Sequence, residues 1–298
     1  MSVQTAGSEP ITFFGGKGGV GKTTMAGAFA LGQAAAGLRT LLISTDPAHS
    51  LADVLGTPLG DTPTEIVAGL WVWEPDGEDA VRRRVAEVVE DAHSVVPAEI
   101  MPAVQRHLRH ATQTPGMVES ALADQLMGAM ERVPEEFDCL VVDSAPTGQL
   151  LRMVSLPSLL TPWVQGLARH RDRARRAEAL AVDAIGGDDP DGQTDPLLQR
   201  LHARRIRLET TARRLREESE VRLVLLPRRM VLAETQRARR QLEEAGLRLG
   251  PVALNQVPVD ADPAILAEVR ERFGDCGLIE QPLLAQEPTG VQRLRDLS

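Results

Sequence analysis

The chain of 298 residues is 43% hydrophobic and 25% charged, which supports one large α/β domain or two smaller ones with a sizeable core. A formal net charge of −9 and an aromatic content of 3% argue against a nucleic-acid partner, because the summed field repels phosphate and few side chains can stack on bases. Two cysteines rule out a disulfide framework, the apolar runs are too short for a transmembrane helix, and residues 1–10 lack the features of a signal peptide, so we expect a cytoplasmic protein.

The first predicted elements are a strand from Ile11 to Phe14 and a helix from Met25 to Ala36, joined by a glycine-rich loop. The loop reads G-x-x-x-x-G-K-T from Gly16. Its glycines let successive backbone N–H groups converge on phosphate oxygens at the positive end of the helix. This order of strand, loop and helix predicts a nucleoside triphosphate site formed by Gly16, Lys17, Gly18, Gly19, Val20, Gly21, Lys22, Thr23 and Thr24.

Lys17 and Lys22 are the only lysines among the 33 basic residues, and both lie in this loop. Lys22 suits the space between the β- and γ-phosphates, because an ammonium is a compact point charge and a planar guanidinium would not fit there. Lys17 requires a separate explanation, since the loop motif itself uses one lysine. A chain that uses arginine almost everywhere else has thus kept lysine at two positions, both in this loop.

An aspartate lies at or just after the end of two further predicted strands. The first, Leu38 to Ser44, is followed by Asp46, and the second ends at Asp143. Parallel sheets bind ligands at the carboxyl ends of their strands, so we expect both carboxylates beside the phosphates. Asp143 fits a Walker B carboxylate that holds the Mg²⁺ shell, and Gly148 gives the next segment the freedom to move that a γ-phosphate sensor needs. For Asp46, a helix N-cap is the alternative.

Four stretches together resemble one known family. K-G-G-V-G-K-T-T from Lys17 is similar to the deviant Walker A loop of dimeric ATPases. D-P-A-H-S-L-x-D from Asp46 and D-S-A-P-T-G-x-x-L-R from Asp143 look like the switch I and switch II motifs of the ArsA and tail-anchored-protein targeting ATPases. The segments Leu254 to Pro258 and Pro282 to Leu284 are similar to the adenine-contacting segments of that family. The resemblance covers nearly the whole chain.

The resemblance implies a homodimeric ATPase that binds ATP and ADP with Mg²⁺. Lys17 would reach across the dimer interface to the phosphates of the partner's nucleotide, and Lys22 would hold the β- and γ-phosphates of its own. Asp46 would orient the attacking water. These three are the predicted catalytic residues, and the chemistry asked of them is positioning and charge stabilisation.

The same resemblance assigns the residues that would bind the metal ion and the adenine ring. Thr23, Asp46 and Asp143 would bind Mg²⁺, some of them through water, while Asn255 and Pro282 would contact adenine. Zinc is not expected, because the C-x-x-C of the eukaryotic targeting factor is missing. Arsenite binding through thiolates in the manner of ArsA is not expected either, because the two cysteines lie away from the stretches that would supply it.

Strands alternate with helices at both ends of the chain, which predicts one doubly wound α/β domain of the P-loop NTPase type, with a mostly parallel sheet, over residues 1–298. Two helical insertions, at about 79–133 and 156–220, are expected to form a helical subdomain. In the first, apolar side chains recur every four residues between Val118 and Met130. They form either a face packed on the core or an adaptable groove for apolar helices.

In the second insertion, arginines gather between Arg169 and Arg176 and again in a basic helix, Leu197 to Arg216. They form either a solvated helix face or a surface for anionic lipid headgroups or an acidic partner, with peripheral membrane contact.

These features predict a homodimeric ATPase that couples Mg²⁺-dependent ATP hydrolysis to the binding and targeting of hydrophobic, tail-anchored membrane-protein segments. Two alternatives stay open. One is the energising ATPase of an arsenite or anion efflux pump, and the other is a positioning ATPase like MinD or ParA, which works on membranes or DNA.

Overall fold

The computed structural model describes residues 9–46, 50–93, 101–102, 105, 116–184 and 196–297. The chain divides into two compact units. The core unit contains both ends of the described chain and the segment between the insertions, and the helical unit contains the insertions. The core unit is Met1–Ala80, Val118–Val154 and Arg214–Ser298, and the helical unit is Val81–Met117 and Ser155–Arg213.

The core unit is built on one sheet of nine strands. Most of these are short runs of buried aliphatic residues, as expected of strands covered on both faces. The strands are β1 (Ile11–Gly16), β2 (Thr40–Ser44), β3 (Thr64–Val67), β4 (Leu70–Trp73), β5 (Cys139–Asp143), β6 (Ser219–Leu225), β7 (Arg248–Leu249), β8 (Val252–Val257) and β9 (Leu278–Pro282).

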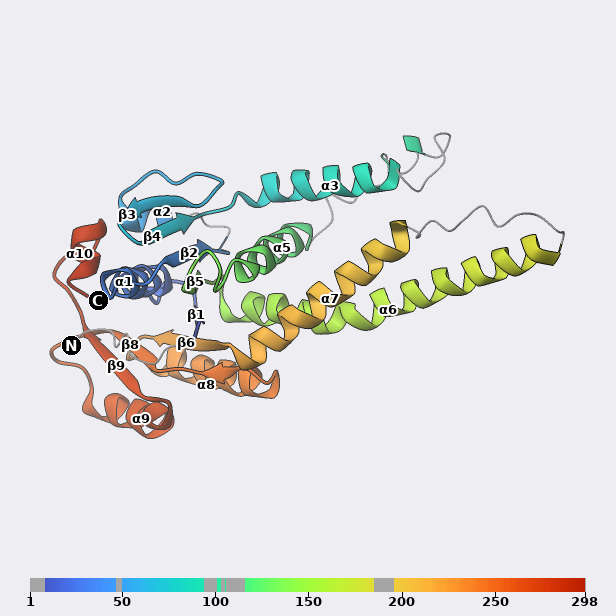
Figure 1. Ribbon diagram of the computed structural model, residues 1–298. Helices are drawn as coiled ribbons and strands as arrows, with labels where there is room; N and C mark the ends of the chain where they lie inside the picture. Colours follow the sequence, from blue (N-terminus) through green and yellow to red (C-terminus); the bar gives the residue numbers. More distant parts are fainter. Residues whose placement is uncertain are drawn as a thin grey trace. The chain divides into compact units, whose positions relative to one another are not determined.

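The strands lie in the order β3-β4-β2-β5-β1-β6-β8-β9 (Figure 1). The short β7 pairs with β6. Every pairing is parallel except that of β3 with β4. The predicted α/β fold with a mostly parallel sheet is therefore confirmed. The strand order reverses at β1, which has β5 and β2 on one side and β6 and β8 on the other. Ligands bind outside the carboxyl ends of the strands at such a reversal, and the glycine loop follows β1 at this point.

Helices of the core unit cover this sheet. The first of them, which directly follows the glycine loop, is buried over most of its length. It packs against the last helix, where a Cβ on Gly27 would lie 3.5 Å from Leu294. These helices are α1 (Lys22–Ala35), α2 (Leu51–Leu55), α5 (Met117–Glu131), α8 (Arg229–Glu244), α9 (Pro263–Phe273) and α10 (Val291–Arg295).

Three helices pass between the units. α3 (Gly77–His93) and α6 (Thr147–Ala184) begin in the core unit and continue into the helical unit, and α7 (Pro196–Glu217) returns from it. Within the helical unit, Gln165 of α6 donates a hydrogen bond of 2.9 Å to Glu209 of α7. No helix in the described part of the chain is long and apolar enough to cross a membrane.

The apolar row on α5 has a definite place in the structure. Leu122, Leu126, Met127 and Met130 are between 1% and 5% exposed. This face therefore packs into the core, and the interpretation of α5 as an open groove for apolar helices is wrong. α5 also belongs almost entirely to the core unit, although the sequence placed its residues in the first helical insertion.

Candidate active site

The glycine loop joins β1 to α1 through positions where only glycine fits. Gly16 has a φ of 151°, and a Cβ there would lie 2.5 Å from the carbonyl oxygen of Val224 on β6. Gly21, the residue before α1, has a φ of 91°, and a Cβ there would lie 2.3 Å from Nδ2 of Asn255 on β8. The loop thus lies directly against two neighbouring strands, with the N-terminus of α1 at its end, which is the geometry of an anion site.

Lys22 and Thr23 begin α1 and are held by polar contacts. The Lys22 side chain is 6% exposed, and its ammonium donates to the carbonyl oxygen of Lys17, 3.4 Å away. The hydroxyl oxygen of Thr23 lies 3.1 Å from that of Ser50, the residue before α2. The start of α1 is therefore connected to the segment that follows β2.

Asp143 ends β5, between the ends of β1 and β2, and is fully buried. Its Oδ2 accepts a hydrogen bond of 3.4 Å from Ser44, whereas its Oδ1 has no hydrogen-bond partner among the described residues. Burial raises the pKa of this carboxyl to about 7; the Thr23 hydroxyl and the Lys22 ammonium oppose the rise, and the charge of Asp46 adds to it. A buried carboxylate oxygen without a partner is costly, so the position suits a bound cation.

Asp46 lies just past β2, and its backbone N–H donates to the hydroxyl of Ser44, 3.3 Å away. The motif residues Pro47, Ala48 and His49 lie outside the described part of the chain. The alternative interpretation of Asp46 as a helix cap is wrong, because α2 begins only at Leu51 and another side chain accepts its first N–H groups.

That side chain is Glu74, which the sequence analysis did not single out. Its Oε1 accepts from the N–H of Leu51 at 2.8 Å, and its Oε2 accepts from the N–H of Ala52 at 3.4 Å. Glu74 directly follows β4, so the signal that could have found it is a carboxylate at the end of a buried strand, the same signal that identified Asp143.

Asn255 and Pro282 lie at the carboxyl ends of β8 and β9, which are neighbours in the sheet. Asn255 is 9% exposed, and its Nδ2 donates to the carbonyl oxygen of Val20 at 2.9 Å while its Oδ1 accepts from the N–H of Gln256 at 2.9 Å. An amide has two N–H groups, so one donor remains for a ligand. The structure thus brings both residues to the loop edge, and their contact with adenine stays a prediction.

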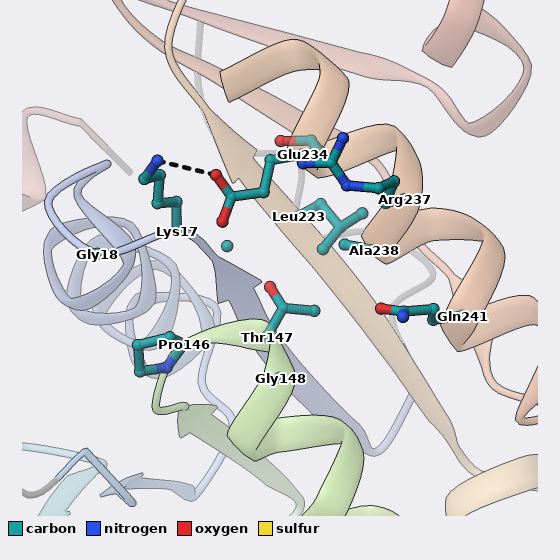
Figure 2. A pocket seen from close by; sticks show the side chains of 12 residues that line it. Lys17, Gly18, Pro146, Thr147, Gly148, Leu223, Glu234, Arg237, Ala238 and Gln241 are labelled. Atoms are coloured by element: carbon teal, nitrogen blue, oxygen red, sulfur yellow. Dashed lines mark ion pairs between the residues drawn. The ribbon is translucent and has the colours of Figure 1, made fainter. Parts of the chain in front are cut away.

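Lys17 points away from its own loop. Its ammonium pairs with Oε2 of Glu234 on α8 at 2.9 Å (Figure 2). The pair borders a cavity of about 290 Å³ whose walls are the glycine loop, the segment after β5, and the facing sides of β6 and α8. The residues around it are Gly16, Lys17, Gly18, Pro146, Thr147, Gly148, Leu223, Glu234, Thr235, Arg237, Ala238 and Gln241.

Comparison with known families shows which family the chain belongs to. The profile of the family described as anion-transporting ATPase matches residues 10–298. The chain belongs to this ArsA family of ATPases. Members of this family are ATPases, so membership implies in general that the chain binds ATP with Mg²⁺ and hydrolyses it.

Three relatives show the range of the ArsA family around this chain. A protein of Aquifex aeolicus, provisionally named arsenical pump-driving ATPase 2, is 27% identical over 97% of both chains. The arsenical pump-driving ATPase of Acidiphilium multivorum is 29% identical over 96% of this chain but only 45% of its own length. ATPase ASNA1 homolog 1 of Paramecium tetraurelia is 24% identical over 95% of this chain and 89% of its own. This ArsA-family chain thus spans less than half of the Acidiphilium protein.

The donor set fits the Mg²⁺ that an ArsA-family ATPase uses. Asp143 offers an unpaired carboxylate oxygen and Thr23 a hydroxyl, and Mg²⁺ usually takes one or two protein oxygens and keeps water for the rest of its shell. When bound, Mg²⁺ would neutralise charge on the phosphate oxygens. The protein contributes to this site by holding Asp143 between two strands and by keeping the Lys22 ammonium inside the loop.

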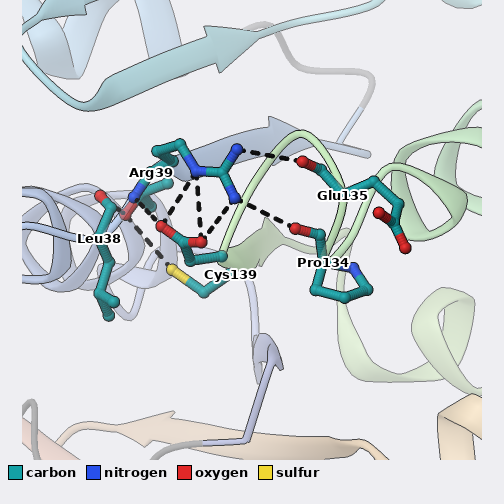
Figure 3. Close-up of polar contacts among 7 residues, drawn as sticks. Leu38, Arg39, Pro134, Glu135 and Cys139 are labelled. Carbon is teal, nitrogen blue, oxygen red and sulfur yellow. Dashed lines mark hydrogen bonds and ion pairs between the residues drawn. The ribbon is translucent and has the colours of Figure 1, made fainter.

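The polar cluster in Figure 3 lies at the start of β5, at the opposite end from Asp143. Its role in this ArsA-family ATPase is structural. Arg39 binds Asp138 through its backbone N–H at 2.8 Å and its guanidinium at 2.7 Å, and reaches the carbonyl oxygen of Glu135 at 3.1 Å. Next to it, Sγ of the buried Cys139 lies 3.3 Å from the Thr40 hydroxyl, and burial raises the pKa of the thiol. Cys139 is therefore a packed, protonated side chain at the opposite edge from the nucleotide loop.

Proposed function

We propose that this ArsA-family ATPase works as a homodimer, hydrolyses ATP with Mg²⁺, and uses its nucleotide state to bind and release apolar helices of membrane proteins, tail-anchored segments in particular. The client part of this proposal rests on one observation, an apolar stripe on α6. The nucleotide part rests on the loop and the carboxylates around it.

The α6 stripe consists of Leu156, Leu159, Leu160 and Leu167. At about 100° per residue these four positions fall within roughly 100° of arc on one side of the helix. Leu159 is 70% exposed and Leu167 is 39% exposed, while the other two are partly exposed. Because apolar surface in water costs about 25 cal/mol per Å², a helix face of this kind favours an apolar partner, and a single apolar helix would cover it.

Arginines follow the stripe along α6, which supports delivery at a membrane. Arg169, Arg173 and Arg176 are exposed, and Arg176 pairs with Asp172 of the same helix at 2.7 Å. Each exposed arginine near an anionic membrane surface contributes about 1 kcal/mol of favourable interaction free energy with the lipid headgroups. The proposal therefore includes peripheral contact with a membrane surface.

For hydrolysis, we assign Lys22 to the β- and γ-phosphates and Asp46 to the orientation of the attacking water. The support is that Lys22 is buried within the loop and that Asp46 follows a strand end next to Asp143. Lys17 would act on the partner's phosphates, which makes the dimer necessary for turnover. Thr23 and Asp143 would hold the metal.

The experiment that tests the client is a trap. The Asp46→Asn variant should hold ATP in a closed dimer, so it is purified from its host cells with ATP and Mg²⁺ and the co-purifying proteins are identified by mass spectrometry. Enrichment of proteins with a single C-terminal apolar helix is expected. Recovery of a polytopic transporter, or of nothing apolar, would contradict the targeting function. An unchanged kcat would remove Asp46 from the catalytic residues.

A matched pair of variants assigns the client to α6. In the trap background, Leu159→Arg should remove the clients, because it places a charge in the middle of the stripe. Ser158→Arg adds the same side chain to an exposed position on the other side of the helix and should leave the clients bound. Equal recovery from both variants would exclude the stripe as the binding surface.

A second candidate is the energising ATPase of an anion pump, which the names of the Aquifex and Acidiphilium relatives state for those proteins. Stimulation of ATP turnover by arsenite would favour it, although the packed Cys139 offers no thiolate at the site. A MinD-like membrane function has less support. It would need a helix that is free to lie on the membrane, whereas α10 packs on α1 and its Leu294 is 0% exposed. Liposome or DNA binding that depends on nucleotide, without an apolar client, would revive it.

A further inference from the structure

Glu74 connects the end of β4 to the start of α2. Its two carboxylate oxygens accept the N–H groups of Leu51 and Ala52, 2.8 and 3.4 Å away. Ser50, the residue before α2, makes no side-chain capping bond within the described part of the chain. The first N–H groups of a helix need an outside acceptor, and a carboxylate there also interacts favourably with the positive helix end. Glu74 therefore holds the first turn of α2 in place.

The position of α2 decides where Ser50 lies, because Ser50 directly precedes it. The Ser50 hydroxyl is 3.1 Å from the hydroxyl of Thr23 at the start of α1. At the other end of the same segment, the N–H of Asp46 donates to Ser44, which in turn donates to Asp143. Asp46 is thus connected through Ser44 to the buried carboxylate, and the start of α2 is connected through Glu74 to β4.

We propose that Glu74 is a positioning residue for ATP hydrolysis. It fixes the end of switch I, and Ser50 then holds the Thr23 hydroxyl in the orientation required for the metal. Glu74 contacts the N–H groups of Leu51 and Ala52, so it acts on Thr23 through α2 and Ser50. A carboxylate is required because two N–H groups must be accepted at once, and charge-assisted bonds of this kind are stronger than neutral ones.

The test compares Glu74→Gln with the wild-type protein. Glutamine keeps the size of the side chain but has one acceptor oxygen, so one N–H of α2 faces an amide NH₂ group. We expect the Mg²⁺ concentration for half-maximal turnover to rise about tenfold, which corresponds to the loss of a typical helix cap. Hydrogen exchange of the amides in residues 50–55 should accelerate by about the same factor. ATP binding in the presence of EDTA should stay unchanged.

Glu65→Gln is the matched control. Glu65 lies on β3, and its Oε1 accepts the backbone N–H of Gly69 at 3.0 Å in the turn before β4. The variant makes the same substitution in the same hairpin without touching switch I, and the remaining amide oxygen can still accept the single N–H of Gly69. It should change neither the Mg²⁺ requirement nor hydrogen exchange in residues 50–55.

A double-mutant cycle tests the path through Ser50. Ser50→Ala should raise the Mg²⁺ requirement as Glu74→Gln does, and the double variant should be no worse than the more affected single one, because both act through one connection. Additive effects would overturn the proposal. So would a lowered Tm of Glu74→Gln with an unchanged Mg²⁺ requirement. If Glu74→Gln does not fold, an unchanged Mg²⁺ requirement of Ser50→Ala overturns it.

Discussion

Nζ of Lys17 lies 2.9 Å from Oε2 of Glu234, and the two side chains are 45% and 43% exposed. The lysine that the family resemblance assigns to a partner's phosphates is therefore paired within its own chain, beside the cavity that the segment after β5 also lines. Exposed ion pairs of this kind contribute about 0–1 kcal/mol. The pair can thus open at small cost when a phosphate becomes available to Lys17.

Lys17→Arg tests the assigned role of the lysine at a partner's phosphates. We expect cooperative ATP hydrolysis to be lost while nucleotide binding is largely retained. Arginine keeps the charge and can still pair with Glu234, but its planar guanidinium does not replace an ammonium between phosphates. The measurement is kcat against protein concentration, with nucleotide affinity determined in parallel. Normal turnover would remove the assignment of Lys17 to the partner's nucleotide.

Glu234→Gln tests whether the pair within the chain competes with dimer formation. Two pairs open when two chains join, so their loss should lower the Kd of the ATP-bound dimer by up to roughly 30-fold, if each contributes about 1 kcal/mol. Sedimentation with ATP and Mg²⁺ measures the dimer fraction. Glu244→Gln, exposed on the same helix, is the control and should leave it unchanged. A weaker Glu234→Gln dimer would mean that Glu234 guides Lys17 instead of withholding it.

Asp143 should make stability depend on pH when no Mg²⁺ is present. Its pKa of about 7 lies above the ordinary value of 3.8, so the folded chain binds more protons than the unfolded chain between these values. The free energy of unfolding therefore falls as pH rises through this window, since an uncompensated charge forms in the core. Thermal unfolding from pH 5 to 8 should show this fall, which amounts to roughly a few kcal/mol.

Asp143→Asn provides the comparison for the pH experiment, because asparagine cannot ionise. The difference in slope between the two proteins isolates Asp143 from the other carboxylates. Added Mg²⁺ should raise the Tm of the wild-type protein more at pH 8 than at pH 6, because the ionised carboxylate is the form that binds it. Identical slopes for both proteins would exclude a raised pKa at Asp143.

Gly21→Ala should damage both the loop and the fold. The φ of 91° is unfavourable for alanine, and the new Cβ would displace Nδ2 of Asn255 from its bond to Val20. We expect a loss of about 1–3 kcal/mol in the free energy of unfolding, together with weaker nucleotide binding. Chemical denaturation measures the first. Gly18→Ala, with no heavy atom within 4 Å of the added Cβ, should leave the free energy of unfolding unchanged.

The features that the sequence predicted well are those whose geometry depends on neighbours along the chain. Glycines at positions 16 and 21 and a lysine after the second of them specify a phosphate loop when a strand precedes and a helix follows. A buried apolar run that ends in Asp143 specifies a carboxylate at the edge of a parallel sheet. The fold class followed from the same alternation of strands and helices.

Other features were decided by the tertiary structure alone. The apolar row of α5 is compatible with a groove or a core, and only its burial in the folded chain distinguishes the two. α6 continues through Pro157 and Pro162 as one helix, although proline is unfavourable in a helix interior.

Long-range contacts were the least predictable part of the site. Glu74 reaches α2 because β4 lies next to β2, Glu234 pairs with Lys17 at the border of the cavity, and Asn255 contacts Val20 over a separation of 235 residues. Each contact depends on the order of strands in the sheet. By itself, the sequence determined the chemistry at each strand end, because that chemistry is local. Only the tertiary structure decided which strand ends meet, because strand order is set by the packing of the whole sheet.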